Sequence, residues 1–312
     1  MRNTLGRASR WILRCGAVGT LVLGAGGIAR ADVIPLSDLN STATIDTGAG
    51  VTSWFVDGTS RLYNQSFFYY FTDDSGNVQN GQLGVVGAGD NPGMPSTGFS
   101  HGANTAEVDY SNGSISAKVL YTLTGDAPGS DKSTLIETIT VQNLMGIELQ
   151  GDNYLHLFQY ADFDMCGLGS TGDSISIGAG GASQTGTCDG IVASESVSPD
   201  AGNQWWPYAG GAFDAGERSG LLSTLAHPVD LLNNSSFNGA GVDDAAFAFE
   251  WNLPLLAYGG SWSGGGRGDT ASVTVTKSIA PVPEPMSLML LGAGLVGVGR
   301  MVRRRRGEVV VA

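Results

Sequence analysis

The sequence predicts an all-β chain whose main domain is an antiparallel two-sheet β-sandwich. Glycine makes up 48 of the 312 residues, against a typical share of ~7%, and it gathers with Asn, Asp and Ser between short apolar runs. Within these runs, apolar residues recur at every second position, which is the period of a strand with one buried face. Glycine-rich turns between alternating runs are typical of antiparallel hairpins, which favours a sandwich.

The clearest expected strands are 66–72, 115–123, 134–142, 154–160, 247–253 and 273–279. The first is aromatic from Phe67 to Phe71, so we expect it to be covered on both faces. The segment 73–77 has the Asp, Ser, Gly and Asn composition of a hairpin turn. A single short helix is expected at 219–226. We assign residues 32–280 to one domain, because this length suits one large β domain.

The first 31 residues have the three parts of a secretory signal peptide. Arg2, Arg7, Arg10 and Arg14 precede an uncharged stretch at 15–28, and small residues follow it. We therefore expect signal peptidase to cleave between Ala31 and Asp32. Cys15 precedes most of the apolar stretch, so it does not fit a lipid-modified cysteine and should leave with the signal peptide.

A second apolar segment, 286–299, lies near the C-terminus. Pro283, Glu284 and Pro285 precede it, and a basic cluster follows it, made of Arg300, Arg303, Arg304, Arg305 and Arg306. As a helix, fourteen apolar residues would span roughly 21 Å, less than the ~30 Å of a bilayer core. The arginines would remain cytoplasmic, which orients the domain outward.

This arrangement closely resembles the PEP-CTERM sorting signal, over residues 281–307. The resemblance implies that a membrane-embedded exosortase recognises Pro283, Glu284 and Pro285 in a Gram-negative bacterium. It further implies a single transmembrane sorting helix, a transient anchor, and a final place at the cell surface or outside the cell. A weaker resemblance, which includes the phrase from Phe158 to Asp164, links the domain to a β-rich ectodomain type found among such proteins and implies no activity.

The domain between the two ends is strongly acidic. Five of the sixteen basic residues lie in 1–31 and five in 281–312, whereas only two of the twenty-nine acidic residues lie in those segments. Residues 32–280 thus hold six bases and twenty-seven acids, a formal charge of 6 − 27 = −21. This sign argues against nucleic acids and anionic membranes, whose phosphates need Lys and Arg. It is compatible with divalent cations.

Cys166 and Cys188 are the two cysteines of this domain. Export to an oxidising compartment favours a disulfide between them, worth roughly 3 kcal/mol if it is unstrained. Metal ligation is the alternative, although neither cysteine has a second one within C-x-x-C reach.

Asp162 and Asp164 are the main candidates for chemistry. In an extended segment, residues two apart point to the same side, so these carboxylates could bind Ca²⁺, the one cofactor we consider. They could also act as acid and base, with Glu137 from another strand as a third group. Solvated or turn-capping acids are the simpler interpretation. His156 shares a face with apolar neighbours and is expected to pack in the core.

Trp205, Trp206 and Tyr208 lie in a Gly- and Asn-rich setting, where exposed rings could stack on sugars. Closure of the core is the alternative role for these rings. Two hypotheses follow for the function of the protein. The first is a non-enzymatic surface or matrix protein that contacts exopolysaccharide in a biofilm. The second is a secreted carbohydrate-active enzyme, similar to a glycoside hydrolase, that uses Asp162 and Asp164.

Overall fold

Strands dominate the protein, as the alternating pattern predicts. The computed structural model describes residues 31–86, 93–149, 153–165, 173–178, 180–186, 188, 190–198, 205–210, 238–242, 244–257 and 269–282. The first nine strands are β1 (Val33–Asp38), β2 (Ser41–Asp46), β3 (Gly50–Val56), β4 (Thr59–Leu62), β5 (Asn64–Thr72), β6 (Val78–Gly84), β7 (Met94–His101), β8 (Thr105–Ser111) and β9 (Ile115–Gly125). The other nine are β10 (Ser133–Asn143), β11 (Leu155–Asp162), β12 (Asp173–Gly178), β13 (Gly181–Thr185), β14 (Ile191–Ser198), β15 (Trp205–Gly210), β16 (Asn238–Val242), β17 (Asp244–Leu253) and β18 (Thr270–Pro281).

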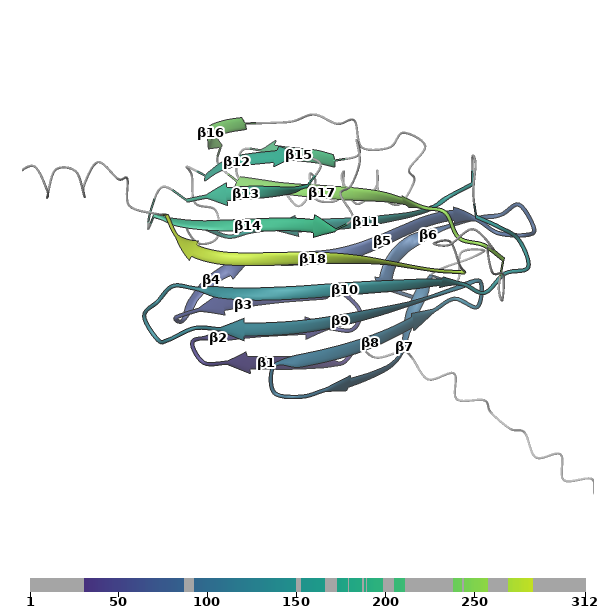
Figure 1. Cartoon of the computed structure of the whole chain (residues 1–312), viewed down its shortest axis with the longest axis horizontal. Coiled ribbons are helices and arrows are strands. Elements are labelled where there is room, and N and C mark those ends of the chain that lie inside the picture. The colour runs from purple at the N-terminus through teal and green to yellow at the C-terminus, as the bar shows by residue number, and fades with distance from the viewer. Residues whose placement is uncertain are drawn as a thin grey trace, which may run out of the picture.

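The strands form two antiparallel series. One runs β1-β2-β3 and continues through β5, β11 and β17 to β15, with β4 and β6 paired to β3 and β5. The other runs β7-β8-β9-β10-β18-β14-β13-β12-β16. Figure 1 shows the second series in front and the first behind it.

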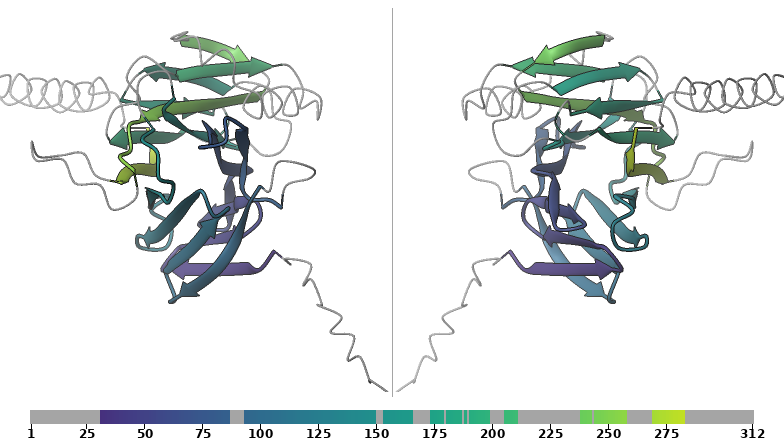
Figure 2. Two further views of the ribbon diagram at one scale, coloured as in Figure 1. Left: turned by 90° about the vertical axis from the view of Figure 1, so that its right-hand side faces the viewer. Right: turned by 90° about the vertical axis from the view of Figure 1, so that its left-hand side faces the viewer.

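A short parallel pairing between β6 and β7 joins the two series into one mixed sheet of eighteen strands. The predicted division into two separate sheets is therefore not confirmed. The sheet folds over instead, so that the two series face one another (Figure 2). One large apolar cluster contains side chains of both, and the Trp54 indole Nε1 on β3 donates a 3.3 Å hydrogen bond to Ser133 Oγ on β10.

The predicted strand faces agree closely with the structure. Ile115, Ala117, Val119, Tyr121 and Leu123 are all buried on one face of β9. On β5, both faces are covered over most of the strand, as its aromatic run predicts. The predicted 73–77 turn closes the β5–β6 hairpin, where Asp73 Oδ1 accepts hydrogen bonds from the Ser75 and Asn77 amides.

The two predicted ends fall mostly outside the described residues. Residues 1–30 and 283–312 are not described, so signal cleavage and the sorting helix remain predictions, as does the helix at 219–226. At the expected mature start, the Asp32 amide donates to Thr47 Oγ1 at 2.9 Å, and the Thr47 amide donates to the Asp32 carbonyl oxygen. Among the described residues, no helix has the length and apolarity to cross a membrane.

Candidate functional site

Asp162 and Asp164 lie in two different environments. β11 ends at Asp162, so the two-residue period that would align the pair does not extend to Asp164. Asp162 is buried, and its Oδ2 accepts a 3.2 Å hydrogen bond from the Tyr160 hydroxyl. Asp164 is half-buried and lines a surface cavity. Asp164 is thus the member of the pair that faces a space where a ligand could bind.

This cavity, which we call the β3–β4 pocket, has a volume of about 340 Å³. Its lining comes from the β3–β4 hairpin, the residue after that hairpin, and the segment that follows β11. The lining residues are Thr52, Ser53, Phe55, Ser60, Leu62, Tyr63 and Asp164. The pocket therefore combines two aromatic rings, several hydroxyls and one carboxylate.

A β-bulge shapes the hairpin beneath this pocket. Trp54 pairs with Leu62 and Phe55 pairs with Ser60, so Arg61 is the extra residue on β4. Bulges redirect side chains because the extra residue breaks the alternation of the strand. Here both Arg61 and Leu62 are buried, while Phe55 is 38% exposed.

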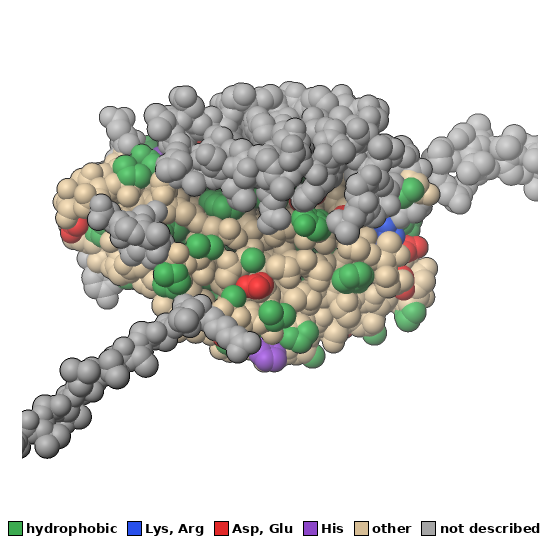
Figure 3. All heavy atoms as spheres, turned by 180° about the vertical axis from the view of Figure 1, so that it is seen from behind, with side chains coloured by type: hydrophobic (Ala, Val, Ile, Leu, Met, Phe, Trp, Pro, Cys, Tyr) green, Lys and Arg blue, Asp and Glu red, His purple; other side chains and the backbone are tan. Residues whose placement is uncertain are grey.

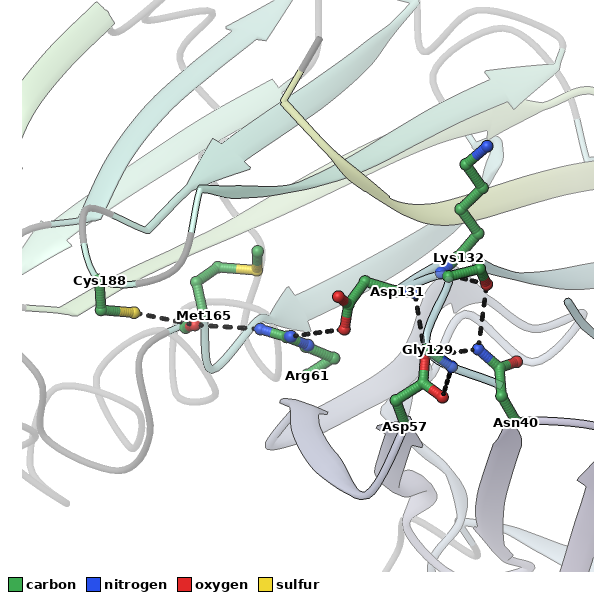
Figure 4. A network of polar contacts seen from close by, with 9 residues as sticks. Asn40, Asp57, Arg61, Gly129, Asp131, Lys132, Met165 and Cys188 are labelled. Carbon is green, nitrogen blue, oxygen red and sulfur yellow. Dashed lines mark hydrogen bonds and ion pairs between the residues drawn. The ribbon is translucent and has the colours of Figure 1, made fainter. Parts of the chain in front are cut away.

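The buried Arg61 side chain connects the hairpin to two neighbouring segments (Figure 4). Its Nη1 donates a 3.5 Å hydrogen bond to the Met165 carbonyl oxygen, and its Nη2 lies 3.7 Å from Asp131 Oδ1. Figure 4 also shows Asp57, whose carboxylate accepts hydrogen bonds from the Gly129 and Asp131 amides. These bonds lower the pKa of Asp57, the Gly129 amide most of all. These contacts hold the β3–β4 hairpin in place beneath the pocket.

Backbone hydrogen bonds set the position of Asp164. The Tyr63 amide donates to the Asp162 carbonyl oxygen at 3.0 Å, and the Asp164 amide donates to the Arg61 carbonyl oxygen at 3.2 Å. These bonds hold segment 162–164 beside segment 61–63. Because these two segments lie side by side, Asp164 and Tyr63 line the same cavity.

The sequence reasoning missed Phe55 and Tyr63. A signal for Phe55 was available, because it falls between Trp54 and Val56, which take the inward positions of β3. Tyr63 had no comparable signal, because the bulge at Arg61 shifts the alternation just before it. The contact between Asp164 and the hairpin joins residues about one hundred positions apart, which no local pattern encodes.

Glu137, the third carboxylate in the enzyme hypothesis, lies in a different part of the molecule. It is fully buried on β10, and Lys277 Nζ on β18 donates a 2.7 Å hydrogen bond to its Oε2. Lys277 Nζ also lies 3.3 Å from Glu195 Oε2 on β14, and Gln159 Nε2 on β11 donates to that same oxygen at 3.3 Å. Gln159 and Asp162 are three positions apart on β11, so they face opposite sides of the strand. Glu137 is therefore on the interior side, away from Asp162.

The buried ionic group formed by Glu137, Glu195 and Lys277 holds two carboxylates against one ammonium. Burial raises the pKa of Glu195 to about 7, because Lys277 only partly offsets the loss of hydration and Glu137 adds repulsion. Burial also raises the pKa of Glu137 above its ordinary value. For Lys277, burial alone would lower the pKa, but the two carboxylates raise it. The lysine is thus charged, and the carboxylates compete for it.

His156 lies on the side of β11 that carries Asp162. It is buried, and its Nδ1 lies 2.8 Å from Glu250 Oε1 on β17. The ring stacks near Phe158 and meets Tyr70 edge-on. The expectation of a packed histidine agrees with these contacts, although the buried glutamate partner was not foreseen.

The remaining predicted site residues are only partly described. The backbone of β15 pairs Trp205 with Phe249, Trp206 with Ala248 and Tyr208 with Ala246, which gives their register but does not test sugar stacking. The sorting residues Pro283, Glu284 and Pro285 and the arginine cluster lie outside the described residues. In the part of the chain that is described, no three His, Cys, Asp or Glu side chains are grouped to hold a metal ion. A calcium site at Asp162 and Asp164 stays a prediction.

The cysteine pair is also only partly described. Cys166 lies outside the described residues, so its disulfide with Cys188 remains a prediction. Cys188 Sγ lies 3.5 Å from the carbonyl oxygen of Met165, the residue directly before Cys166 (Figure 4). This position is compatible with the predicted bond.

Comparison with known proteins identifies the C-terminal segment. Residues 281–306 match the PEP-CTERM protein-sorting motif, which confirms the identification made from Pro283, Glu284, Pro285 and the arginine cluster. The motif indicates a secreted, transiently membrane-anchored protein. No curated protein shows significant similarity to the chain.

Several solved structures resemble the chain weakly. A GalM/aldose epimerase homologue from C. elegans aligns with a TM-score of 0.45 and 10% identity, over 81% of this chain and 100% of that one. An Aspergillus nidulans amine oxidase aligns with a TM-score of 0.38 and 8% identity, over 89% of this chain and 56% of that one. The Pichia pastoris lysyl oxidase PPLO aligns with a TM-score of 0.32 and 10% identity, over 76% of this chain and 51% of that one. Likenesses this weak transfer no activity to this chain.

Proposed function

We propose that this chain, which carries a PEP-CTERM sorting motif at its C-terminal end, is a non-enzymatic protein of the cell surface or extracellular matrix that binds exopolysaccharide. In this proposal, signal peptidase cleaves between Ala31 and Asp32, and an exosortase then processes the C-terminal segment of a Gram-negative producer. The β domain remains at the surface or outside the cell. Its association with the cell's own polysaccharide would contribute to a biofilm.

The observation that carries the proposal is the match of residues 281–306 to the sorting motif. The chemistry of the segment supports it independently. Two prolines around Glu284 give a stiff, extended connector that a protease can reach, and the apolar run with its arginines suits a short anchor with a cytoplasmic end.

The placement of the carboxylates supports a non-enzymatic role. A glycoside hydrolase needs two carboxyl groups that flank one bond, roughly 5 to 9.5 Å apart. Glu137 is instead engaged by Lys277 in the interior, and Asp162 is buried with Tyr160 on the other side of β11. Neither Asp162 nor Glu137, the other two carboxylates that the enzyme hypothesis named, lines the β3–β4 pocket with Asp164.

The sorting part of the proposal is tested by Glu284→Ala in the full chain expressed in its own host. We expect the variant to accumulate as an uncleaved membrane form, whereas the wild type is found as a shorter form that begins at Asp32 by mass spectrometry. Glu308→Ala is the matched control, because it removes an acid outside the matched residues. Equal processing of both variants would show that the motif is not recognised through Glu284.

The binding part is tested by co-sedimentation of the released protein with the producing organism's extracellular polysaccharide, with and without calcium. New reducing ends are measured in the same samples. Binding without new ends agrees with a matrix protein. New ends that disappear in Asp164→Asn would identify an enzyme and refute the non-enzymatic proposal.

A further inference from the structure

We infer that the β3–β4 pocket binds one unit of an uncharged polysaccharide, with Phe55 and Tyr63 against the sugar ring and Asp164 accepting hydrogen bonds from its hydroxyls. The inference rests on the proposed function and deepens it. It names the binding site and the chemical class of the polymer.

The size and the aromatic lining of the pocket suit a sugar ring. A pyranose has an apolar C–H face and a polar rim of hydroxyls, so it needs an aromatic surface beside polar groups. Phe55 is 38% exposed, and the half-buried Tyr63 lines the same cavity. A volume of about 340 Å³ lies at the small end of ligand sites, which fits one monosaccharide unit of a longer chain that passes over the surface.

The polar lining suits hydroxyl groups. The Asp164 carboxylate offers two acceptor oxygens, and a sugar presents several O–H donors. Ser53 and Ser60 line the same cavity, and each hydroxyl can donate or accept. A neutral polyol can donate to the carboxylate and can exchange hydrogen bonds with both serine hydroxyls.

The charge of the protein disfavours acidic polymers. Asp164 is the carboxylate of the pocket, and the described residues that line it include no basic side chain. Among the described residues, Arg61 and Lys277 are buried, which leaves Lys118 and Lys132 as the exposed bases. On the face drawn in Figure 3, basic side chains are correspondingly scarce. Residues 32–280 as a whole carry a formal charge of −21, so a polyuronate would meet net repulsion from the protein.

The pocket is also preorganised. The bulge fixes Phe55 and Ser60 as a cross-strand pair, Arg61 connects the hairpin to Met165 and Asp131, and backbone bonds hold Asp164 in place. A site that is already ordered loses less conformational entropy on binding, so modest contacts give measurable affinity.

The test uses the released, processed protein and the producing organism's extracellular polysaccharide, which is separated by anion exchange into neutral and acidic fractions. We compare wild type, Phe55→Ala, Tyr63→Ala and the matched control Phe99→Ala by affinity electrophoresis. Phe99 is 43% exposed on β7 and is not part of the β3–β4 pocket. Loss of one stacking ring should weaken binding about tenfold, and the control should bind as wild type does.

Three results would overturn the inference, and they are distinguishable. If both pocket variants still bind the neutral fraction, the proposed site is wrong but the proposed function is not. If the protein binds the acidic fraction preferentially, the proposed ligand class is wrong. Failure of wild type to bind either fraction refutes the proposed function itself. Phe55→Leu, which keeps apolar volume without an aromatic face, replaces Phe55→Ala if the alanine variant has a lower melting temperature.

Discussion

The buried ionic group predicts an unusual pH dependence of stability, which Glu195→Gln isolates. Glu195 lies fully buried between Lys277 and Gln159, beside the competing carboxylate of Glu137. Glutamine has nearly the same shape and keeps an oxygen for Lys277. It removes the ionisable proton, so it imitates the protonated carboxyl at every pH.

The magnitude follows from the shift in pKa. The value for Glu195 rises from an ordinary 4.5 to about 7 because burial disfavours the anion. Each pKa unit corresponds to about 1.36 kcal/mol, so ionising Glu195 in the folded state costs about 3 kcal/mol. The folded protein holds this proton more tightly than the unfolded chain. The stability that this tightly held proton gives the folded state is therefore fully present below about pH 4.5, and it is lost as pH rises through about 7.

The assay is urea unfolding of wild type and Glu195→Gln between pH 4.5 and 8. We expect the variant to gain about 3 kcal/mol relative to wild type over this range, because only the wild type has to ionise the buried carboxyl. Glu107→Gln is the surface control. Glu107 pairs with the exposed Lys118, and such pairs contribute about 0 to 1 kcal/mol.

Two results would refute this reasoning. A difference between wild type and Glu195→Gln that does not change with pH would mean that Glu195 is ionised throughout. If Glu195→Gln became less stable than wild type as pH rises, the attraction between Lys277 and the ionised Glu195 would exceed the cost of burying that charge. Glu137→Gln provides a second measurement. In this variant Lys277 pairs with Glu195 alone, so the fall in stability with rising pH should be smaller than in wild type.

Three further predictions concern stability. Lys277→Met leaves two buried carboxylates without a cation, so it should cost about 3 to 5 kcal/mol at pH 8 and less at pH 4.5, measured by urea unfolding. Gly50→Ala should cost more than about 2 kcal/mol, because Gly50 has φ +90° and a Cβ would lie 2.3 Å from the Gln65 carbonyl oxygen. Gly58→Ala, also at positive φ but in open space, is its control and should cost less. Cys188→Ser should lower stability by about 3 kcal/mol under oxidising conditions and not in reductant, and an unchanged melting temperature would exclude the predicted disulfide.

The sequence contained more about the interior than we predicted from it. Lys277 falls in the inward phase of the alternation that contains Val273, Val275 and Ile279, and Glu137 falls between Leu135 and Ile139 in the same way. A charged residue at an inward position signals a buried ionic partner. The identity of that partner depends on strand register, which the alternation of one strand does not encode.

The strand order was beyond prediction for a related reason. β11 pairs with β5 and β17, so its neighbours come from segments roughly ninety residues away on either side. Alternation predicts each strand and its buried face, but many orders would bury the same faces. The β3–β4 pocket could not be predicted for the same reason. The bulge at Arg61 and the position of Asp164 beside the hairpin both depend on tertiary contacts.

The position of β18 links the interior to the sorting motif. β18 lies between β10 and β14, and Lys277 bridges carboxylates on both of these neighbours. A one-residue slip would turn Lys277 to the outer face and leave Glu137 and Glu195 buried without it, so the ionic group favours one register. β18 ends at Pro281, where the matched motif begins, and the Val282 amide still donates to the Gly190 carbonyl oxygen at 2.7 Å. Cleavage beyond Val282 would leave the strand and its charge partners intact, so we expect removal of the sorting segment to leave the stability of the β domain unchanged.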